Sequence, residues 1–439
     1  MALDYYIQSG GKRLRCGFTT GTCAALAAAG AAAGLLTGVL PDHMSLVTPA
    51  GVPVEVPLVR VKTGVSSVCG VYKDAGDDRD ATDGILIVAE VSCGKEGESG
   101  TAAVTSRKEG ESGAAEASCE KNCTGDDTQF SDGVTVQIEG GPGVGLVTKP
   151  GLDQPVGAAA INSTPRRMIE DAVRRVCEST GYEGAIRVCI SVPDGEKIAA
   201  KTFNGHLGIE GGISILGTSG IVKPMSMQAY IDAVNVEIRQ HAAMGKKRLI
   251  LTPGNYGINF LHEMQGRSLS LSDMQDADLQ DVEEILRDES VPVVMCSNFI
   301  GDSLDSAGMH GFEEVLLTGH IGKMVKLAGG IMNTHSLFAD CRTDLFCAHA
   351  AVCGARTEVC REIMSAATTD ACLGILEREG IRDAVLDSLM SAICSHISRR
   401  VRGKYRIHVL VFSNIYGILG IRTVFPHTLD TEKSCDTMN

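Results

Sequence analysis

The first half of the chain alternates short β-type patterns with glycine-rich turns. Apolar and polar positions alternate, and β-branched residues are frequent, in segments that predict strands over residues 52–61, 66–75, 85–92, 185–192 and 197–203. A run of small apolar residues behind the Thr19–Thr22 hydroxyls predicts a closely packed helix capped by threonine. Residues 164–180 have helical periodicity, with Pro165 near the first turn. Together these patterns predict an α+β domain over residues 1–225.

The second half has a different pattern. Continuous apolar runs over residues 247–253, 291–297, 314–320 and 406–413 are typical of strands buried on both faces. Helical patterns, the first over residues 227–244, separate these runs. Apolar strands alternating with helices indicate βαβ crossovers, so we predict an α/β domain with a small parallel sheet over residues 226–439.

Residues 94–129 interrupt the first domain. The hexapeptide KEGESG begins at Lys95 and again at Lys108, and the segment has almost no apolar residues. Such a composition buries too little surface to offset the entropy of ordering, so we expect a disordered surface loop without a function of its own.

Composition narrows the classes of function. The 439 residues carry a net charge of −14, which argues against a nucleic-acid partner. The 16 cysteines include no CxxC pair, which indicates reduced thiols in a cytoplasmic protein. Residues 12–38 imitate a signal peptide, but the Thr19–Thr22 cluster lies inside the apolar part, so we expect neither a signal peptide nor a membrane partner.

Polar, glycine-containing turns follow the predicted strands of the second domain. They contain Gly254, Asn255, Tyr256 and Gly257 in one turn, Asn298, Gly301 and Asp302 in the next, and the TGHIGK and SNIYG segments after the last two strands. Ligands of parallel α/β sheets bind at this edge, although glycine and asparagine also serve tight turns. No GxGxxG or Walker motif occurs, so NAD, an adenosyl cofactor and a sugar nucleotide all remain open.

The segment from Val315 to Asp340 combines core and polar positions. A helix from Gly319 would bury a stripe made of Ile321, Met324, Val325 and Ala328 and place His320 and Lys323 on another face. A lysine at the positive end of a helix is unfavourable, which suggests an anionic partner; the alternative is a lysine that faces solvent.

Residues 329–340 continue this segment. Gly329 and Gly330 end the helix, and Thr334 is predicted to cap a second helix over residues 335–355. His335 then faces a cleft as an acid, a base or a ligand, with Asp340 nearby and Ser336 beside it. Ordinary capping and solvation are the alternative.

Two segments of the first domain are weaker candidates. Residues 73–84 carry five aspartates, among them Asp77, a candidate general base; calcium-loop spacing is met only loosely, and we predict no metal. The glycine-rich turn Gly140–Leu152 ends near Lys149 and has the composition of an anion-binding loop or an ordinary turn.

The sequence resembles the CbiD family, the cobalt-precorrin-5B (C1)-methyltransferases of anaerobic cobalamin biosynthesis. The resemblance rests on seven blocks in order: GFTTGTCAALAA, VYKDAGDDRDATDG, GVGLVTKPGLDQPVGAAAINSTPRRMI, GTSGIVKPMS, LTPGNYG, SNFIGDSLD and TGHIGKMVKLAGGIMNTHSLFAD. The insertion and the cysteine-rich tail depart from the family pattern but lie outside these blocks.

The resemblance implies S-adenosylmethionine as co-substrate and a cobalt-containing tetrapyrrole as acceptor. It implies a first domain similar to a permuted second domain of ribosomal protein S5 and a second domain that binds the methyl donor at Gly254–Gly257, Asn298, Gly301 and Asp302. The acceptor's carboxylates would be bound by the residues Thr19, Thr20, Thr22, Lys149, Lys323, Thr334 and Ser336. His320, His335 and Asp77 are the candidates for proton transfer.

Two other functions use the same residues. A corrinoid carrier would use His320 or His335 as an axial cobalt ligand without chemistry, and an NAD-dependent reductase would use the same strand-end turns. A homo-oligomer is possible, since nothing in the sequence fixes the number of subunits.

Overall fold

The computed structural model describes residues 3–9, 11–62, 64–94, 133–202, 204–205, 207–224, 226–265 and 278–425. The predicted insertion lies outside these residues from position 95 on. Contacts divide the chain into two compact units, residues 1–148 with 156–225, and residues 149–155 with 226–439. The second unit therefore includes a short segment, Lys149–Pro155, from the first half of the sequence.

Unit 1 is built on a five-stranded sheet of order β6-β7-β8-β12-β9, in which only the β12–β9 pair is parallel. Its strands are β6 (Val59–Lys62), β7 (Ser66–Tyr72), β8 (Leu86–Cys93), β9 (Val134–Gly140) and β12 (Gly184–Ser191). Shorter pairs join β1 (Tyr6–Ser9) to β2 (Lys12–Arg15), β3 (Gly17–Phe18) to β15 (Ile221–Val222), β4 (His43–Val47) to β5 (Pro53–Pro57), β10 (Gly143–Val144) to β14 (Gly212–Ile213), and β11 (Leu146–Val147) to β13 (Ile209–Glu210).

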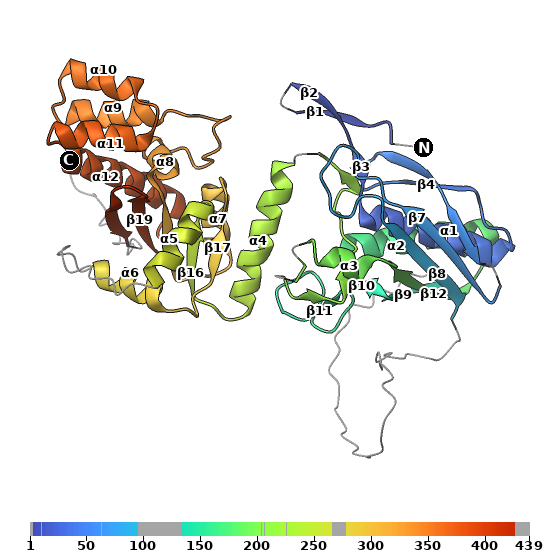
Figure 1. The fold of residues 1–439 in the computed structure, drawn as a ribbon. Helices are drawn as coiled ribbons and strands as arrows, with labels where there is room; N and C mark the ends of the chain where they lie inside the picture. The colour runs from blue at the N-terminus through green and yellow to red at the C-terminus, as the bar shows by residue number, and fades with distance from the viewer. Residues whose placement is uncertain are drawn as a thin grey trace, which may run out of the picture. The chain divides into compact units, whose positions relative to one another are not determined.

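Helices α1 (Thr20–Thr37) and α2 (Ser163–Thr180) pack against each other and against this sheet (Figure 1). The predicted cap is confirmed, because the Thr19 hydroxyl accepts a hydrogen bond from the Thr22 amide. A Cβ at Gly30 would lie 2.4 Å from Leu58, so glycine permits the close packing. Among the described helices, α1 alone is long and apolar enough to span a membrane, but 78% of that stretch is buried inside the unit.

One predicted strand of this unit is wrong. Residues 197–203 were expected to be extended, but residues 195–199 form the short helix α3 (Gly195–Ala199). Ile198 and Ala199 pack against the core of the unit from this single helical turn. Glu, Lys and Ala favour helix over strand, and a seven-residue segment has too little periodicity to decide against that preference.

Unit 2 contains the predicted parallel sheet, of order β17-β16-β18-β19-β20. Strands β16 (Arg248–Thr252), β17 (Val293–Met295), β18 (Glu314–His320) and β19 (Arg406–Ser413) are parallel, and the unpredicted edge strand β20 (Gly417–Val424) is antiparallel. The helices are α4 (Met227–Ala243), α5 (Asn255–Gln265), α6 (Asp278–Arg287), α7 (Ile300–Met309), α8 (Ile321–Met324) with the 3-10 turn η2 (Val325–Gly329), α9 (Arg342–Val352), α10 (Thr357–Ser365), α11 (Thr369–Arg378) and α12 (Arg382–Val401).

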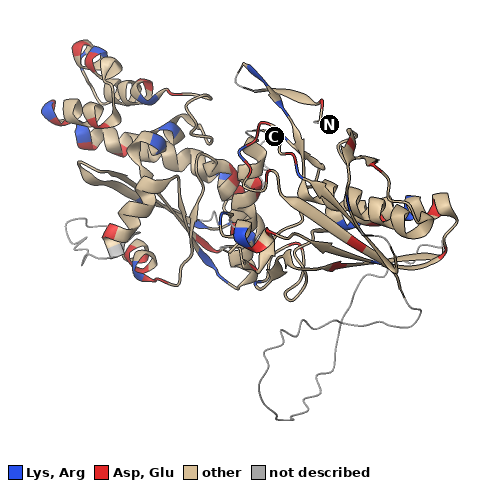
Figure 2. Ribbon diagram, turned by 45° about the vertical axis from the view of Figure 1, so that its right-hand side comes forward, with Lys and Arg blue, Asp and Glu red and all other residues tan. Residues whose placement is uncertain are grey.

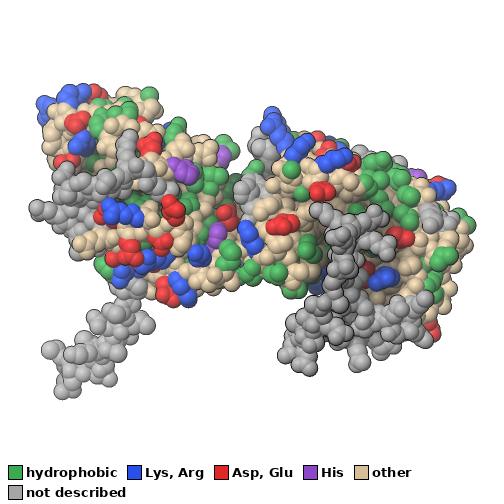
Figure 3. Space-filling model, turned by 60° about the horizontal axis from the view of Figure 1, so that its bottom comes forward, with side chains coloured by type: hydrophobic (Ala, Val, Ile, Leu, Met, Phe, Trp, Pro, Cys, Tyr) green, Lys and Arg blue, Asp and Glu red, His purple; other side chains and the backbone are tan. Residues whose placement is uncertain are grey.

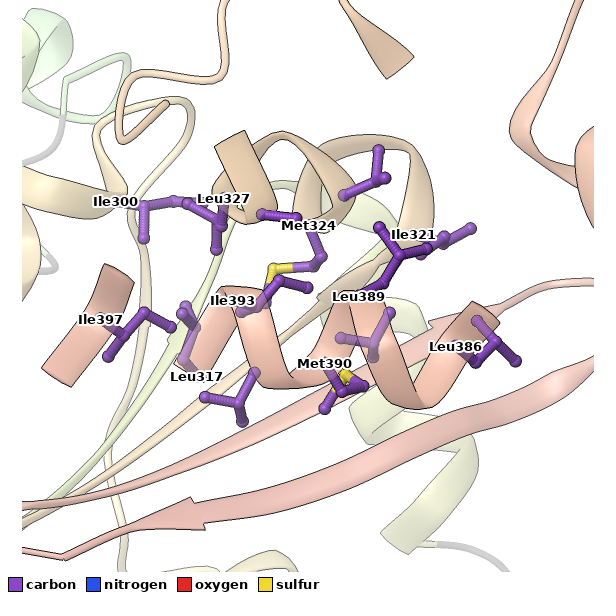
Figure 4. Close-up of a cluster of buried hydrophobic side chains, with 14 of the residues drawn as sticks. Ile300, Leu317, Ile321, Met324, Leu327, Leu386, Leu389, Met390, Ile393 and Ile397 are labelled. Atoms are coloured by element: carbon purple, nitrogen blue, oxygen red, sulfur yellow. The ribbon is translucent and has the colours of Figure 1, made fainter. Parts of the chain in front are cut away.

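The main core of unit 2 lies between the sheet, α8–η2 and α12. Figure 4 shows Met324 of α8 pointing toward Ile393 of α12, and Leu327 of η2 beside Ile300 of α7. The predicted stripe is confirmed, because Ile321, Met324, Val325 and Ala328 are all buried. Outside this core, the exposed surfaces of the carboxyl-terminal helices carry Lys and Arg interspersed with Asp and Glu (Figure 2).

The predicted second helix begins later than expected. Residues 335–341 are not helical, and α9 starts at Arg342. Thr334 therefore caps no helix; its amide donates to the Asn298 carbonyl instead. The polar groups of residues 333–340 find partners in one another and in distant residues, which local sequence patterns do not reveal.

Two glycines let separate segments of unit 1 cross at backbone contact. A Cβ at Gly17 would lie 2.2 Å from the Asp74 carbonyl oxygen, and one at Gly76 would lie 2.3 Å from the Arg15 carbonyl oxygen. The Phe18 amide donates to the Asp74 carbonyl, and the Arg15 guanidinium binds the Asp74 carboxylate through two hydrogen bonds. The acidic turn is therefore fastened directly to the strand that precedes α1.

We expect Gly17→Ala to destabilise unit 1 by about 2 kcal/mol or more, because the new methyl group meets backbone that cannot rotate away. Gly205→Ala is the matched control, since a Cβ at Gly205 meets nothing within 4 Å. Thermal unfolding followed by circular dichroism measures both variants. If both variants had the same midpoint of thermal unfolding, the close backbone contact between Gly17 and Asp74 would be contradicted.

Candidate functional site

The order of the strands in unit 2 places a crevice between β16 and β18. The crossover from β16 through α5 and α6 leads to β17 on one side, and the crossover from β17 through α7 leads to β18 on the other. Leu261 of α5 packs with Ile250 and Leu316 on one face of the sheet, whereas Ile321 of α8 packs with Leu317 on the opposite face. The loops after β16 and β18 therefore diverge, which is the arrangement that binds ligands in open α/β sheets.

A pocket of about 320 Å³ lies at these loops. It is lined by Pro253, Tyr256, Gly257, Gly319, His320, Gly322, Lys323, Arg342, Thr368, Thr369 and Asp370. A Cβ at Gly319 would lie 2.9 Å from the Pro253 ring, so the two loops begin in direct contact before they separate. The starts of α5, α8, α9 and α11 all contribute to its wall, so the positive ends of several helix dipoles lie beside the pocket.

His320 caps α8 from inside this pocket. Its Nδ1 accepts a hydrogen bond from the Gly322 amide at 3.1 Å, and its ring lies edge-on to Phe412 and 5.5 Å from the Tyr256 ring. Burial lowers the pKa of His320, which favours the neutral ring. With Nδ1 accepting, the neutral ring carries its proton on Nε2 and so presents a donor rather than a base.

Lys323 spans the crevice from α8 to the end of β17. Its Nζ donates to the Ser297 carbonyl at 3.1 Å, and burial lowers its pKa. A Cβ at Gly254 would lie 3.5 Å from this Nζ, so the ammonium also approaches the turn after β16. Ser297 has a φ of 54°, an uncommon backbone conformation for a residue with a side chain. Lys323 therefore brings a half-buried cation to the centre of the strand-end turns.

The polar groups of the turn after β17 mostly form hydrogen bonds with other residues of the protein. The Asn298 side chain accepts from the Thr334 hydroxyl, and its carbonyl accepts from the Thr334 amide. A Cβ at Gly301 would collide with Arg400, whose guanidinium donates to the Gly301 carbonyl. Asp302 lies in the first turn of α7 and is partly exposed. Of the predicted donor-binding residues, Tyr256 and Gly257 line the pocket. The other five do not line it, namely Gly254, Asn255, Asn298, Gly301 and Asp302.

The loop of residues 331–341 is held by a lysine that the sequence analysis did not single out. Lys326 is 3% exposed, and its Nζ donates to the carbonyls of Thr334 and Ala339. His335 accepts a hydrogen bond from the Leu337 amide through Nδ1, so its neutral ring also has the proton on Nε2. The exposed Asp340 binds Arg342 through two hydrogen bonds.

Asp370 is the second residue that the sequence analysis missed. It carries the one carboxylate among the pocket-lining residues and accepts a hydrogen bond from the Ser413 hydroxyl at 2.6 Å. Thr368 caps α11 by accepting from the Ala371 amide. The Thr368–Asp370 pattern is a typical helix start, but no local signal indicates that this helix packs at the end of β19.

The predicted residues of unit 1 make contacts within that unit. The hydroxyls of Thr20 and Thr22 donate to backbone carbonyls of Ser214, Leu216 and Gly220, and both side chains are buried. Asp77 accepts from the Arg15 amide at the edge of the acidic turn. Thr19 to Thr22 thus fasten residues 214–220 to the start of α1 rather than facing solvent.

The predicted anion-binding loop, Gly140–Leu152, uses its amide groups internally. Gly145 donates to the Ile213 carbonyl, and Val147 donates to Ala158. Lys149 belongs to the segment that packs in unit 2, where the Gly151 carbonyl accepts from Arg239 of α4. The structure therefore does not bring Lys149 into the pocket lining of His320 and Lys323.

Two further features among the described residues are a hollow in unit 1 and a cluster of titratable side chains in unit 2. A larger hollow of about 470 Å³ in unit 1 is lined mainly by the side of α2 and by β4, and no histidine lies in its wall. Asp281, Glu314 and His408 are close enough to hold a metal ion at the opposite edge of the sheet. Arg406 and Arg248 already pair with the two carboxylates, so this cluster is satisfied as an ion-pair network.

The lowered pKa of His320 predicts how stability depends on pH. Because folding favours the neutral ring, its contribution is present above the unfolded pKa near 6.5 and is lost as the pH falls through the folded pKa. His320→Asn keeps a capping group without the titration. We expect the variant to lose less stability than the wild type between about pH 7.5 and pH 5 in urea unfolding. A larger loss in the variant would mean that the folded protein holds His320 charged.

Comparisons with known proteins identify the family. The model of the CbiD family matches residues 7–224, and the model of the CbiD C-terminal domain matches residues 333–423. The chain is 39% identical to the cobalt-precorrin-5B C(1)-methyltransferase of Ruminiclostridium cellulolyticum over 97% of this chain and 96% of that protein. It is 37% identical to the protein of that name from Photorhabdus laumondii, over 96% of each chain.

A solved structure also resembles the chain. The cobalamin biosynthesis protein (cbiD) from Archaeoglobus fulgidus is 26% identical, with 77% of this chain and 87% of that chain covered and a TM-score of 0.36. The identities to the two methyltransferases extend over both units, so the match is not confined to one domain. The resemblance drawn from the seven sequence blocks is thereby confirmed, and this chain belongs to the CbiD family.

Proposed function

We propose that this chain transfers a methyl group from S-adenosylmethionine to C1 of cobalt-precorrin-5B, giving cobalt-precorrin-6A in anaerobic cobalamin biosynthesis. The observation that carries the proposal is the identity of 39% over almost the whole length to a relative that bears the name cobalt-precorrin-5B C(1)-methyltransferase. The pocket between the β16 and β18 loops supports it, because it is the place where this sheet topology can bind a small ligand.

The methyl donor binds in this proposal at the turn after β16. Gly254, Asn255, Tyr256 and Gly257 form that turn and the start of α5. The carboxylate of Asp370, on the opposite wall, is suited to accept hydrogen bonds from ribose hydroxyls or from the donor's ammonium group. The donor supplies an activated methyl group on a sulfonium.

The protein's contribution to such a reaction is mainly positioning. The new bond from ring carbon C1 to the methyl carbon uses an electron pair of the ring, and the pair of the broken carbon–sulfur bond stays on sulfur, which leaves as S-adenosylhomocysteine. A proton that leaves the macrocycle balances the charge and needs an acceptor. Asp370 is the carboxylate nearest to this chemistry by position in the pocket wall.

The two histidines act in this proposal as hydrogen-bond donors. Both Nδ1 atoms already accept backbone amide hydrogens, those of Gly322 and Leu337. Each ring with its proton on Nε2 offers Nε2–H, which can orient a carboxylate or a ring carbonyl, while the Nδ1 lone pair is occupied by the amide hydrogen. Asp77 remains a candidate base from the sequence, and its contacts support a structural role in unit 1.

The acceptor's carboxylates are bound in the proposal by Lys323, with Thr334 and Ser336 from the adjacent loop and Lys149 as a further cation. Lys323 is the best supported, because its half-buried ammonium pairs with no carboxylate among the described residues and lies beside the donor turn. We further propose that unit 1 has the permuted S5-like topology and that the protein acts in the cytoplasm, as a single subunit or a homo-oligomer.

The direct test is methyl transfer from labelled S-adenosylmethionine to cobalt-precorrin-5B. We expect label in the tetrapyrrole and one additional methyl group in its mass spectrum. Binding of the tetrapyrrole without transfer of label would favour the carrier function. Protection against thermal unfolding by NADH, but not by S-adenosylhomocysteine, would favour the reductase.

The role of Lys323 has its own test. We expect Lys323→Met to raise the Kd of cobalt-precorrin-5B about tenfold, because a charge-assisted hydrogen bond contributes roughly 1.5–3 kcal/mol. The Kd of S-adenosylhomocysteine should change less than about threefold on the same scale. Lys404→Met, an exposed lysine just before β19 at the opposite edge of the sheet, is the control. An unchanged Kd for the tetrapyrrole would leave Lys323 with a structural role.

A further inference from the structure

The loop of residues 331–341 is fixed from inside the protein. Buried Lys326 binds two of its carbonyls, and Asn298 binds Thr334 through both backbone and side chain. A bridge between Phe299 and Asn333 adds a further connection. Burying an ammonium is costly unless it is hydrogen-bonded or paired, and Lys326 is both, because its Nζ also lies 3.7 Å from the Asp340 carboxylate of the same loop.

The fixed loop holds two adjacent large apolar side chains out of the core. Leu337 is 85% exposed and Phe338 is 57% exposed. Scattered exposed hydrophobic side chains are ordinary, as the mixed surface in Figure 3 shows. Adjacent ones on a loop anchored by a buried charge are different, because a solvated loop would need neither the anchor nor the apolar residues.

This pair of residues, the Leu337–Phe338 platform, lies on the segment that leads into the pocket wall. A hollow of about 220 Å³ reaches Asp340 and Cys341 and shares Arg342, Thr368 and Thr369 with the pocket of His320 and Lys323. At the other end of the loop, Asn298 follows Ser297, whose carbonyl binds Lys323. The loop therefore leads at its end into the pocket-lining Arg342, and at its start it is bound to Asn298, next to the residue that accepts from Lys323. In Figure 1 it lies between α8 and α9.

We propose that the Leu337–Phe338 platform binds the apolar face of the tetrapyrrole acceptor while Lys323 binds one of its peripheral carboxylates. This inference rests on the proposed function and assigns to the acceptor two apolar residues that the sequence analysis did not single out. The chemistry of the two partners matches, because the ring has an apolar face and anionic substituents. The platform offers two apolar side chains on a loop next to the pocket that contains the Lys323 ammonium.

A second copy of the chain fits this surface less well. Leu337 and Phe338 together expose roughly 250 Å² of apolar surface, judged from ~150–250 Å² for a large side chain. A stable interface buries about 800 Å² on each partner. The platform therefore has the size for one face of a small ligand and is too small on its own for a dimer.

The test is the double variant Leu337→Ser, Phe338→Ser. Both side chains are exposed, so the substitution should leave folding intact. Cobalt-precorrin-5B is titrated without methyl donor and followed by its visible absorption. We expect its Kd to rise at least tenfold, equivalent to about 1.4 kcal/mol. The Kd of S-adenosylhomocysteine should stay within about twofold of the wild type.

The matched control is Met309→Ser, Val352→Ser, which removes two side chains that are 76% and 83% exposed elsewhere in unit 2. Equal Kd values for the tetrapyrrole in the test variant and the wild type overturn the platform and leave the proposed function intact. A change in sedimentation from dimer to monomer at equal Kd assigns the surface to a second copy instead. If the wild-type protein binds the tetrapyrrole but transfers no methyl group, the proposed function is refuted. That result does not refute the platform, because the platform is tested by the Kd of the tetrapyrrole.

Discussion

The divergence of the chain on either side of β16 determines where unit 2 can bind a small molecule. One crossover places α5 on one face of the sheet, and the next connections place α7 and α8 on the other. Right-handed crossovers leave no other route for these segments, so the loops after β16 and β18 separate at the carboxyl edge. The two loops begin to separate where Gly319 packs against Pro253. The pocket of the candidate site lies at these two loops.

Lys326 extends this arrangement to a loop with no regular structure. Residues 331–341 have neither helix nor strand ladder to satisfy their carbonyls, and the Lys326 ammonium performs that function from the protein interior. Its presence explains how Arg342 and the start of α9 keep a fixed place beside the pocket. A charge buried for this purpose would be hard to replace by an apolar residue, because two carbonyls would lose their donor at once.

Periodicity predicted the parts of the fold in which a long segment has one environment. The strand Glu314–His320, the strand Arg406–Ser413 and α1 were found at nearly their observed bounds. Periodicity gave the wrong structure at residues 197–203, where the segment is short. It also did so at residues 335–341, where distant partners decide the conformation. For the site, the sequence placed Tyr256, Gly257, His320 and Lys323 at strand ends, and they do line one pocket. Asp370 and Lys326 were missed because their roles depend on packing between segments far apart in sequence.

The hydrogen bonds of the histidines narrow the chemistry that the proposed reaction can use. Both rings accept an amide hydrogen two residues ahead, and burial of His320 keeps its neutral form favoured. A neutral ring whose Nδ1 lone pair accepts an amide hydrogen can orient an anion through Nε2–H but is a poor acceptor for a substrate proton. Methyl transfer from a sulfonium asks for alignment and exclusion of water more than for a strong base. The site is therefore better suited to holding two substrates in line than to acid–base catalysis by histidine.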